Sequence, residues 1–119
     1  MSPDKQDPPA ETGANPKTAD DFLQRGWTLH VQGDYNRSEA DFRKALDMDA
    51  NSPEATYAIG MTLKIQGKQK ESAEYFQKTI ELVDAGNLNE DPGRATMLRH
   101  MSEAHIVLMK SGLDLEHLE

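Results

Sequence analysis

Cysteine is absent from this 119-residue sequence, and aromatic residues are few: three phenylalanines, three tyrosines and one tryptophan. Without cysteine, disulfide bonds, thiolate catalysis and sulfur-ligated metal sites are excluded. No stretch approaches the roughly 18 consecutive apolar residues of a membrane-spanning helix, and the first 17 residues lack the apolar run of a secretory signal. We therefore expect a cytoplasmic protein with no membrane partner.

Positive charge is also scarce. Thirteen Lys and Arg stand against 21 Asp and Glu, which gives a formal net charge of -8. A negative field of this kind repels nucleic-acid phosphates and anionic lipid head groups. We expect no nucleic-acid partner, and a ligand that is either basic or indifferent to charge.

The residue patterns of catalytic and metal sites are missing as well. His100 and His105 are five residues apart, which places them off a common helical face, unlike the four-residue spacing of a zinc-binding helix. Neither Gly60 nor Gly67 is followed by the lysine–hydroxyl pair that follows a phosphate-binding glycine loop. We predict that the protein is not an enzyme and that it needs no metal or cofactor.

What the chain does contain is helical patterning after a polar start. Residues 1–17 hold four prolines and no large apolar residue apart from the initial methionine, so they cannot offset the entropy of ordering. We predict a disordered tail over residues 1–17 and one domain over residues 18–119.

Capping residues and glycines divide that domain into about five helices. Thr18 is a good N-cap, and Ser52-Pro53 provides an N-cap followed by proline at the first helical position. Gly33 and Gly67 are suited to helix C-termini. A fifth helix is expected from Pro92 until Gly112, and we assign its inward stripe to four residues with helical spacing, Met97, Met101, Ala104 and Leu108.

The second pair of helices repeats the first at one constant spacing, without a gap. The matched pairs are Gly26 with Gly60, Thr28 with Thr62, Leu29 with Leu63, Gln32 with Gln66, Gly33 with Gly67, Ser38 with Ser72, Phe42 with Phe76, and Lys44 with Lys78. A fixed period of about 34 residues with two helices per unit is the signature of a stacked helical-hairpin repeat. Two similar hairpins in an ordinary bundle are the alternative, but a bundle does not usually keep such residues in one register.

These residues resemble the tetratricopeptide repeat family. The resemblance implies an all-α fold, a right-handed superhelical stack of antiparallel helix hairpins. Its expected parts are one repeat over 19–52, a second over 53–86, a linker over 87–91 and a capping helix over 92–111. The chain departs from the family pattern at Arg25, where leucine is usual, and at Thr56, where tryptophan is usual.

The resemblance also implies a binding site on the first helix of each hairpin, along the concave groove. Eight residues outside the packing stripe occupy these positions: Leu23, Trp27, His30, Val31, Tyr57, Met61, Lys64 and Ile65. Trp, Tyr and Met are frequent in binding hot spots. Two other interpretations remain: a terminal segment or another subunit covers this wall, or Trp27 packs against Tyr57 between the repeats.

Two functions are consistent with these sequence features. The first is a non-catalytic adaptor that binds a peptide or partner protein in the groove. The alternative is a self-assembling scaffold module, a homo-oligomer formed by repeat stacking or through the C-terminal helix. The last helix favours the alternative, because it carries Ile106, Met109 and Leu113 on a second side, whereas a terminal cap is normally polar.

Overall fold

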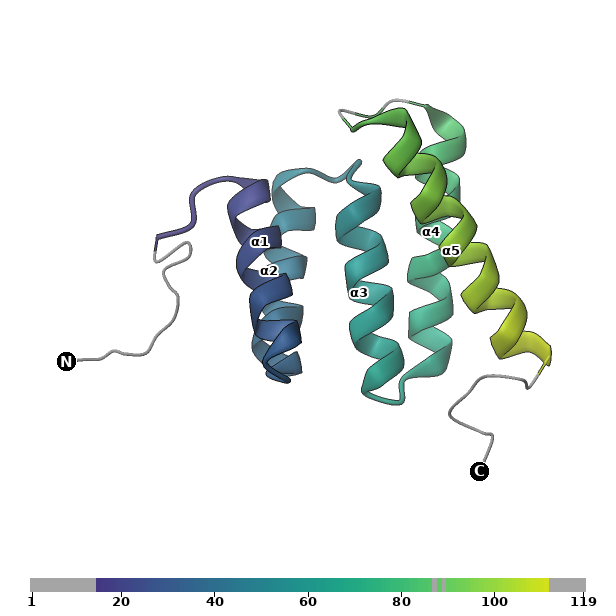
Figure 1. Cartoon of the computed structure of the whole chain (residues 1–119), viewed down its shortest axis with the longest axis horizontal. Coiled ribbons are helices and arrows are strands. Elements are labelled where there is room, and N and C mark those ends of the chain that lie inside the picture. Colours follow the sequence, from purple (N-terminus) through teal and green to yellow (C-terminus); the bar gives the residue numbers. More distant parts are fainter. Residues whose placement is uncertain (1–14, 87, 89, 112–119) are drawn as a thin grey trace.

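The computed structural model describes residues 15–86, 88 and 90–111. Within them the chain forms five α-helices and no strand (Figure 1). The helices are α1 (Ala19–Val31), α2 (Tyr35–Met48), α3 (Pro53–Ile65), α4 (Gln69–Ala85) and α5 (Pro92–Ser111). Most of the predicted tail, residues 87 and 89 of the predicted linker, and the positions Gly112 and Leu113 lie outside the described residues.

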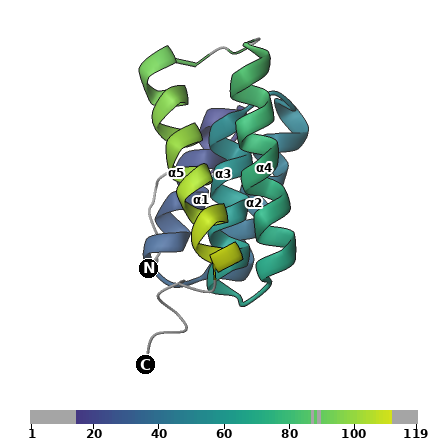
Figure 2. The same cartoon turned by 90° about the vertical axis from the view of Figure 1, so that its right-hand side faces the viewer.

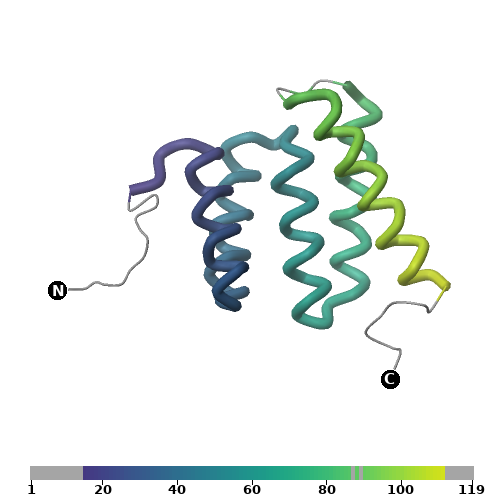
Figure 3. The backbone as a smooth tube through the Cα atoms, viewed as in Figure 1, coloured from purple at the N-terminus to yellow at the C-terminus, as the bar shows by residue number. Residues whose placement is uncertain are grey.

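Each helix packs mainly on its neighbours in the chain. The hairpin pairs are α1 with α2 and α3 with α4. Contacts of α2 with α3 join the two hairpins, and α5 packs on α4. The chain therefore runs up and down through the stack, with α5 at an angle to α4 (Figure 3). Seen from the end, α1, α3 and α5 form one layer and α2 and α4 the other (Figure 2). This is the all-α stack of helix hairpins that the sequence predicts.

The helices begin where the capping residues indicate. Thr18 Oγ1 accepts a hydrogen bond from the Asp21 amide at 3.0 Å, and the Asp21 carboxylate accepts one from the Thr18 amide at 3.2 Å, which is a capping box. Ser52 Oγ accepts a bond from the Ala55 amide at 3.1 Å. The hairpin turns end at Gly33 and Gly67, whose φ angles of 84° and 82° favour glycine.

The register shared by the two hairpins has a packing cause. A Cβ atom on Gly26 would lie 2.5 Å from Cε1 of Phe42, and one on Gly60 would lie 2.8 Å from Cε1 of Phe76. Both phenylalanines are fully buried. In each hairpin the two helices cross at a glycine of the first helix, and the phenylalanine ring of the second helix packs against that glycine. In the second hairpin the Ser72 hydroxyl also donates a hydrogen bond to the Gly60 carbonyl at 2.7 Å.

An ion pair between α1 and α2 lies at the N-terminal end of the stack. Arg25 of α1 binds the Asp41 carboxylate of α2 through two hydrogen bonds, Nε to Oδ2 at 2.8 Å and Nη2 to Oδ1 at 2.9 Å. The equivalent positions of the second hairpin are Ile59 and Tyr75. The first repeat thus carries charge where the second carries apolar side chains, as the outer face of a terminal unit requires.

The prediction that Met97, Met101, Ala104 and Leu108 form the inward stripe of the last helix is wrong. Ala104 is exposed, and Met97, Met101 and Leu108 keep 47%, 38% and 38% of their surface exposed. The buried residues of α5 are Ala95, Leu98 and Ser102, and Ile106 and Met109 pack on the cluster formed by Tyr57, Phe76 and Leu98. The helix carries two apolar stripes with helical spacing, and contact with the two aromatic rings selects the one that contains Leu98.

Candidate functional site

The eight predicted binding residues follow one face of α1 and one face of α3, as their helical spacing requires. They differ widely in exposure. Leu23 and Tyr57 are buried members of the two core clusters, at 6% and 5% exposed. Val31 and Ile65, the last residues of their helices, are 85% and 42% exposed. The other four residues are partly buried, so a ligand has access to six of the eight side chains: Trp27, His30, Val31, Met61, Lys64 and Ile65.

Trp27 connects the two repeats. Its Nε1 donates a hydrogen bond to Glu54 Oε2 of α3 at 3.0 Å, and its ring meets that of Phe42 edge-on with centroids 4.8 Å apart. The ring also packs against the cluster that contains Tyr57. Trp27 therefore has a structural role between α1 and α3, and only the part of its side chain left exposed can contact a ligand.

His30 lies between two aromatic rings. The Trp27 ring is 5.3 Å from it and the Tyr35 ring 5.2 Å, both in edge arrangements. Burial lowers the pKa of His30. At neutral pH this position therefore presents an uncharged imidazole, so that the last turn of α1 offers apolar and aromatic surface.

A second feature, which sequence reasoning missed, is a small polar hollow of about 250 Å³. Its lining comes from the start of α1, the α2–α3 connection, α3 and the start of α5: Ala19, Asp20, Leu23, Asp49, Asn51, Ser52, Glu54, Glu90, Asp91 and Arg94. Arg94 Nη2 lies 3.1 Å from Glu54 Oε2 and its Nε lies 3.6 Å from Glu90 Oε2. Five carboxylates thus share this hollow with one guanidinium group.

Glu90 is an unfavourably placed carboxylate of this group. Burial raises the pKa of its carboxyl group, and the nearby carboxylates of Glu54 and Asp49 raise it further, whereas Arg94 opposes them. A carboxylate in such surroundings is less stable in the folded chain than in water. The charged form of Glu90 therefore lowers the stability of the fold.

Replacing Glu90 with glutamine is expected to stabilise the protein at neutral pH. Because the folded-state pKa lies above the unfolded value of 4.5, the folded chain binds more protons between these two values. The stability of the parent chain falls as the pH rises through this window, so the advantage of Glu90→Gln should be present at pH 7 and vanish near pH 4. Thermal unfolding at both pH values measures it, with exposed Glu74→Gln as the control. A Glu90→Gln variant that melts below the parent at pH 7 would contradict this account.

Comparison with known families decides what kind of protein this is. A sequence model of the tetratricopeptide repeat matches residues 22–52 and 53–82, together just over half of the chain. The chain belongs to the tetratricopeptide repeat family. A comparison with curated proteins finds no match. Tetratricopeptide repeats generally mediate protein–protein interactions, and their fold is typically a non-enzymatic module.

The two departures from the tetratricopeptide repeat pattern have structural partners. Thr56, which stands in place of a large aromatic residue, is fully buried and its Oγ1 lies 2.7 Å from Oγ1 of Thr79. Arg25 forms the ion pair with Asp41 that closes the first repeat. Both positions therefore satisfy their polar groups within the repeat rather than breaking it.

Two further observations bear on metal ions and membranes. Among the described residues, no three His, Asp or Glu side chains come together in a way that can hold a metal ion. No helix in the described part of the chain has the length and apolar character needed to cross a membrane.

Proposed function

We propose that this tetratricopeptide repeat protein is a non-catalytic adaptor that binds a peptide or partner protein on the layer formed by α1 and α3. The binding face consists of the six accessible predicted residues: Trp27, His30, Val31, Met61, Lys64 and Ile65. One observation carries the proposal: Val31 and Ile65, which occupy the same position of the two repeats, are both exposed. Two equivalent apolar side chains left in solvent, beside partly buried Trp27 and Met61, give an extended or helical ligand apolar surface to pack against.

The charge of the chain indicates the chemistry of the partner. The net charge is -8, and several carboxylates surround the hollow at the start of α1, α3 and α5. An acidic segment would meet repulsion there, whereas an apolar segment that is neutral or basic would not. The flexible Met61 side chain and the branched Ile65 side chain supply apolar surface against which the apolar residues of such a segment can pack.

The proposal predicts a loss of binding from two exposed substitutions. Val31→Glu combined with Ile65→Glu places two charges on the binding face without entering the core, so the fold should be kept. Binding should weaken by roughly 2 kcal/mol or more, the scale of hot-spot residues. The measurement compares the proteins that parent and variant retain from a lysate, followed by titration of the retained partner. Trp27, the only tryptophan, reports binding by a shift of its emission.

The matched control carries the same added charge elsewhere. Ala40→Glu combined with Met48→Glu alters two exposed positions of α2, outside the binding face. This control should retain the same partners as the parent. If the Val31 and Ile65 variant is folded by circular dichroism and still retains every partner at the parental affinity, the binding face is not where the partner binds.

A further inference from the structure

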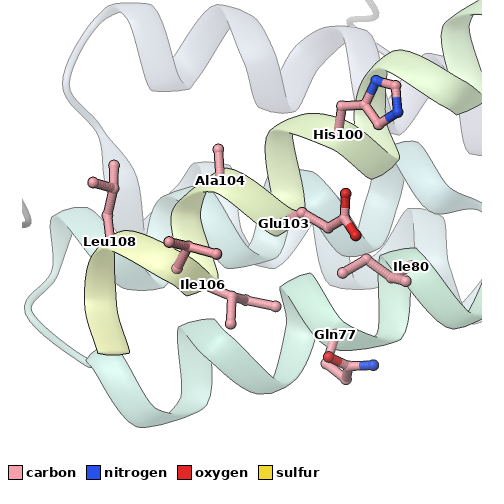
Figure 4. Close-up of a pocket in the computed structure, with 8 residues that line it drawn as sticks. Gln77, Ile80, His100, Glu103, Ala104, Ile106 and Leu108 are labelled. Carbon is pink, nitrogen blue, oxygen red and sulfur yellow. The ribbon is translucent and has the colours of Figure 1, made fainter. Parts of the chain in front are cut away.

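The C-terminal end of the stack carries an open apolar surface. A hollow of about 770 Å³ lies between α4 and α5, with Gln77 and Ile80 on one side. Figure 4 shows Ile106 on the side of α5 nearer to these residues, and Ala104 and Leu108 on the opposite side. Val107, which also lines the hollow, is 62% exposed. A hydrophobic surface of this kind indicates an interaction site.

This end of the stack differs from the other end. The first helix of each complete repeat is covered by a second helix, α2 on α1 and α4 on α3. No further helix covers α5 within the described residues, yet its outer side carries the exposed apolar side chains of Met97, Val107 and Leu108, whereas the N-terminal end has the Arg25–Asp41 pair. The surface of α5 is therefore suited to another helix.

The residues on the outer side of α5 follow a heptad pattern. Met97, His100, Ala104, Val107 and Ser111 are spaced three, four, three and four residues apart, which is the spacing of the seam residues in a two-helix coiled coil, and three of the five are apolar. Ala104 and Ser111 are small enough to let a second helix approach. On the flanks of this seam lie Met101 and Leu108 on one side and Glu103 and Lys110 on the other.

We propose that the helix packed on this seam is α5 of a second copy of the chain, in antiparallel orientation. In that orientation the seam is complementary to itself. Ala104 packs beside Val107 of the other copy. Met101 contacts Leu108 of the other copy, and the two-fold axis generates this contact a second time. Glu103 lies opposite Lys110 of the other copy, also twice, so that each flank pairs opposite charges or apolar side chains.

The local charges of α5 are compatible with this pairing. Glu103 is about half exposed and holds Arg99 Nη1 of its own helix at 3.0 Å, while the rest of the carboxylate remains accessible. Lys110 is exposed. Within the part of the chain that the structure describes, such a seam lies at one end of the stack only, so association through it closes at two copies and does not continue into a filament.

This dimer goes beyond the adaptor function and is tested on the purified full chain without any partner. A single helix pair is smaller than the about 800 Å² per partner of a standard interface, so we expect a dimer that dissociates on dilution in roughly the micromolar range. Sedimentation velocity over a wide range of concentrations measures it. Val107→Glu, at an exposed position, should give a folded monomer at every concentration.

A charge exchange separates this geometry from other contacts. Glu103→Lys alone, or Lys110→Glu alone, places like charges opposite each other twice and should weaken the dimer about tenfold. The double variant Glu103→Lys with Lys110→Glu restores opposite charges and should recover the parental dissociation constant. Circular dichroism of each variant verifies the fold.

Three results would overturn the proposal. The first is a parent chain that is monomeric at all concentrations. The second is a dimer whose dissociation constant the charge exchanges leave unchanged, since another surface would then form it. The third is a dimer that forms only after removal of residues 112–119, since the seam would then be covered by the tail of the chain itself.

Discussion

Gly60→Ala is expected to destabilise the protein by about 1–3 kcal/mol, although it adds a single methyl group. The new Cβ would lie 2.8 Å from Cε1 and 2.9 Å from Cδ1 of Phe76, closer than carbon atoms approach. The ring is fully buried and cannot turn away without disturbing the contact between α3 and α4. Urea unfolding followed by circular dichroism measures the loss. For a domain of this size, each kcal/mol lowers the melting temperature by roughly 4–8 °C.

Two further variants test the cause of that loss. Gly93→Ala, in the first turn of α5, meets only the end of the Asp91 side chain at 3.1 Å, so it should change stability little. Combining Gly60→Ala with Phe76→Leu makes room for the methyl group, and the double variant should be less destabilised than the sum of the two single variants. If Gly60→Ala is as stable as the parent, the two helices do not cross at this glycine.

The same crossing explains why the repeat could be predicted from sequence. Gly26 and Phe42 recur as Gly60 and Phe76 because each hairpin needs a residue without a side chain opposite a large ring. Substitution at either position breaks the contact, so the glycine and the phenylalanine recur at the same spacing in both repeats and can be recognised in the sequence. Helix starts were predictable for a similar local reason, since Thr18 and Ser52 bond to amides within three residues.

The orientation of α5 was not predictable in this way. Its sequence has two apolar stripes, one with Leu98 and Ile106 and the other with Met97 and Met101, and both have helical spacing. The choice between them depends on contacts with Tyr57 and Phe76, which belong to other helices. Periodicity within one helix contains no information about those contacts.

The helix face on which each candidate residue lies could be predicted from the sequence, but the exposure of its side chain could not. Helical spacing places the predicted residues on one face of each helix, yet Leu23 and Tyr57 are covered by neighbouring helices, whereas Val31 and Ile65, the last residues of their helices, are exposed. The polar hollow could not be predicted from the sequence, for a different reason. Its residues come from segments far apart in the chain, such as Asp20 and Arg94, so only the folded stack brings them together.

Leu98→Ala is expected to cost about 2–5 kcal/mol, the range for removing a buried leucine from a core. Leu98 is 3% exposed and forms a cluster with Tyr57 and Phe76, so its loss leaves a cavity beneath α5. Because α5 covers the last face of the second repeat, a cavity there weakens the whole stack, whose units depend on their neighbours. Met97→Ala is the matched control, since that side chain precedes Leu98 directly and is 47% exposed. It should stay within about 0.5 kcal/mol of the parent in dilute solution. Urea unfolding of both variants decides which side of α5 packs on the stack: a larger loss for Met97→Ala than for Leu98→Ala would mean that the helix packs through its other stripe.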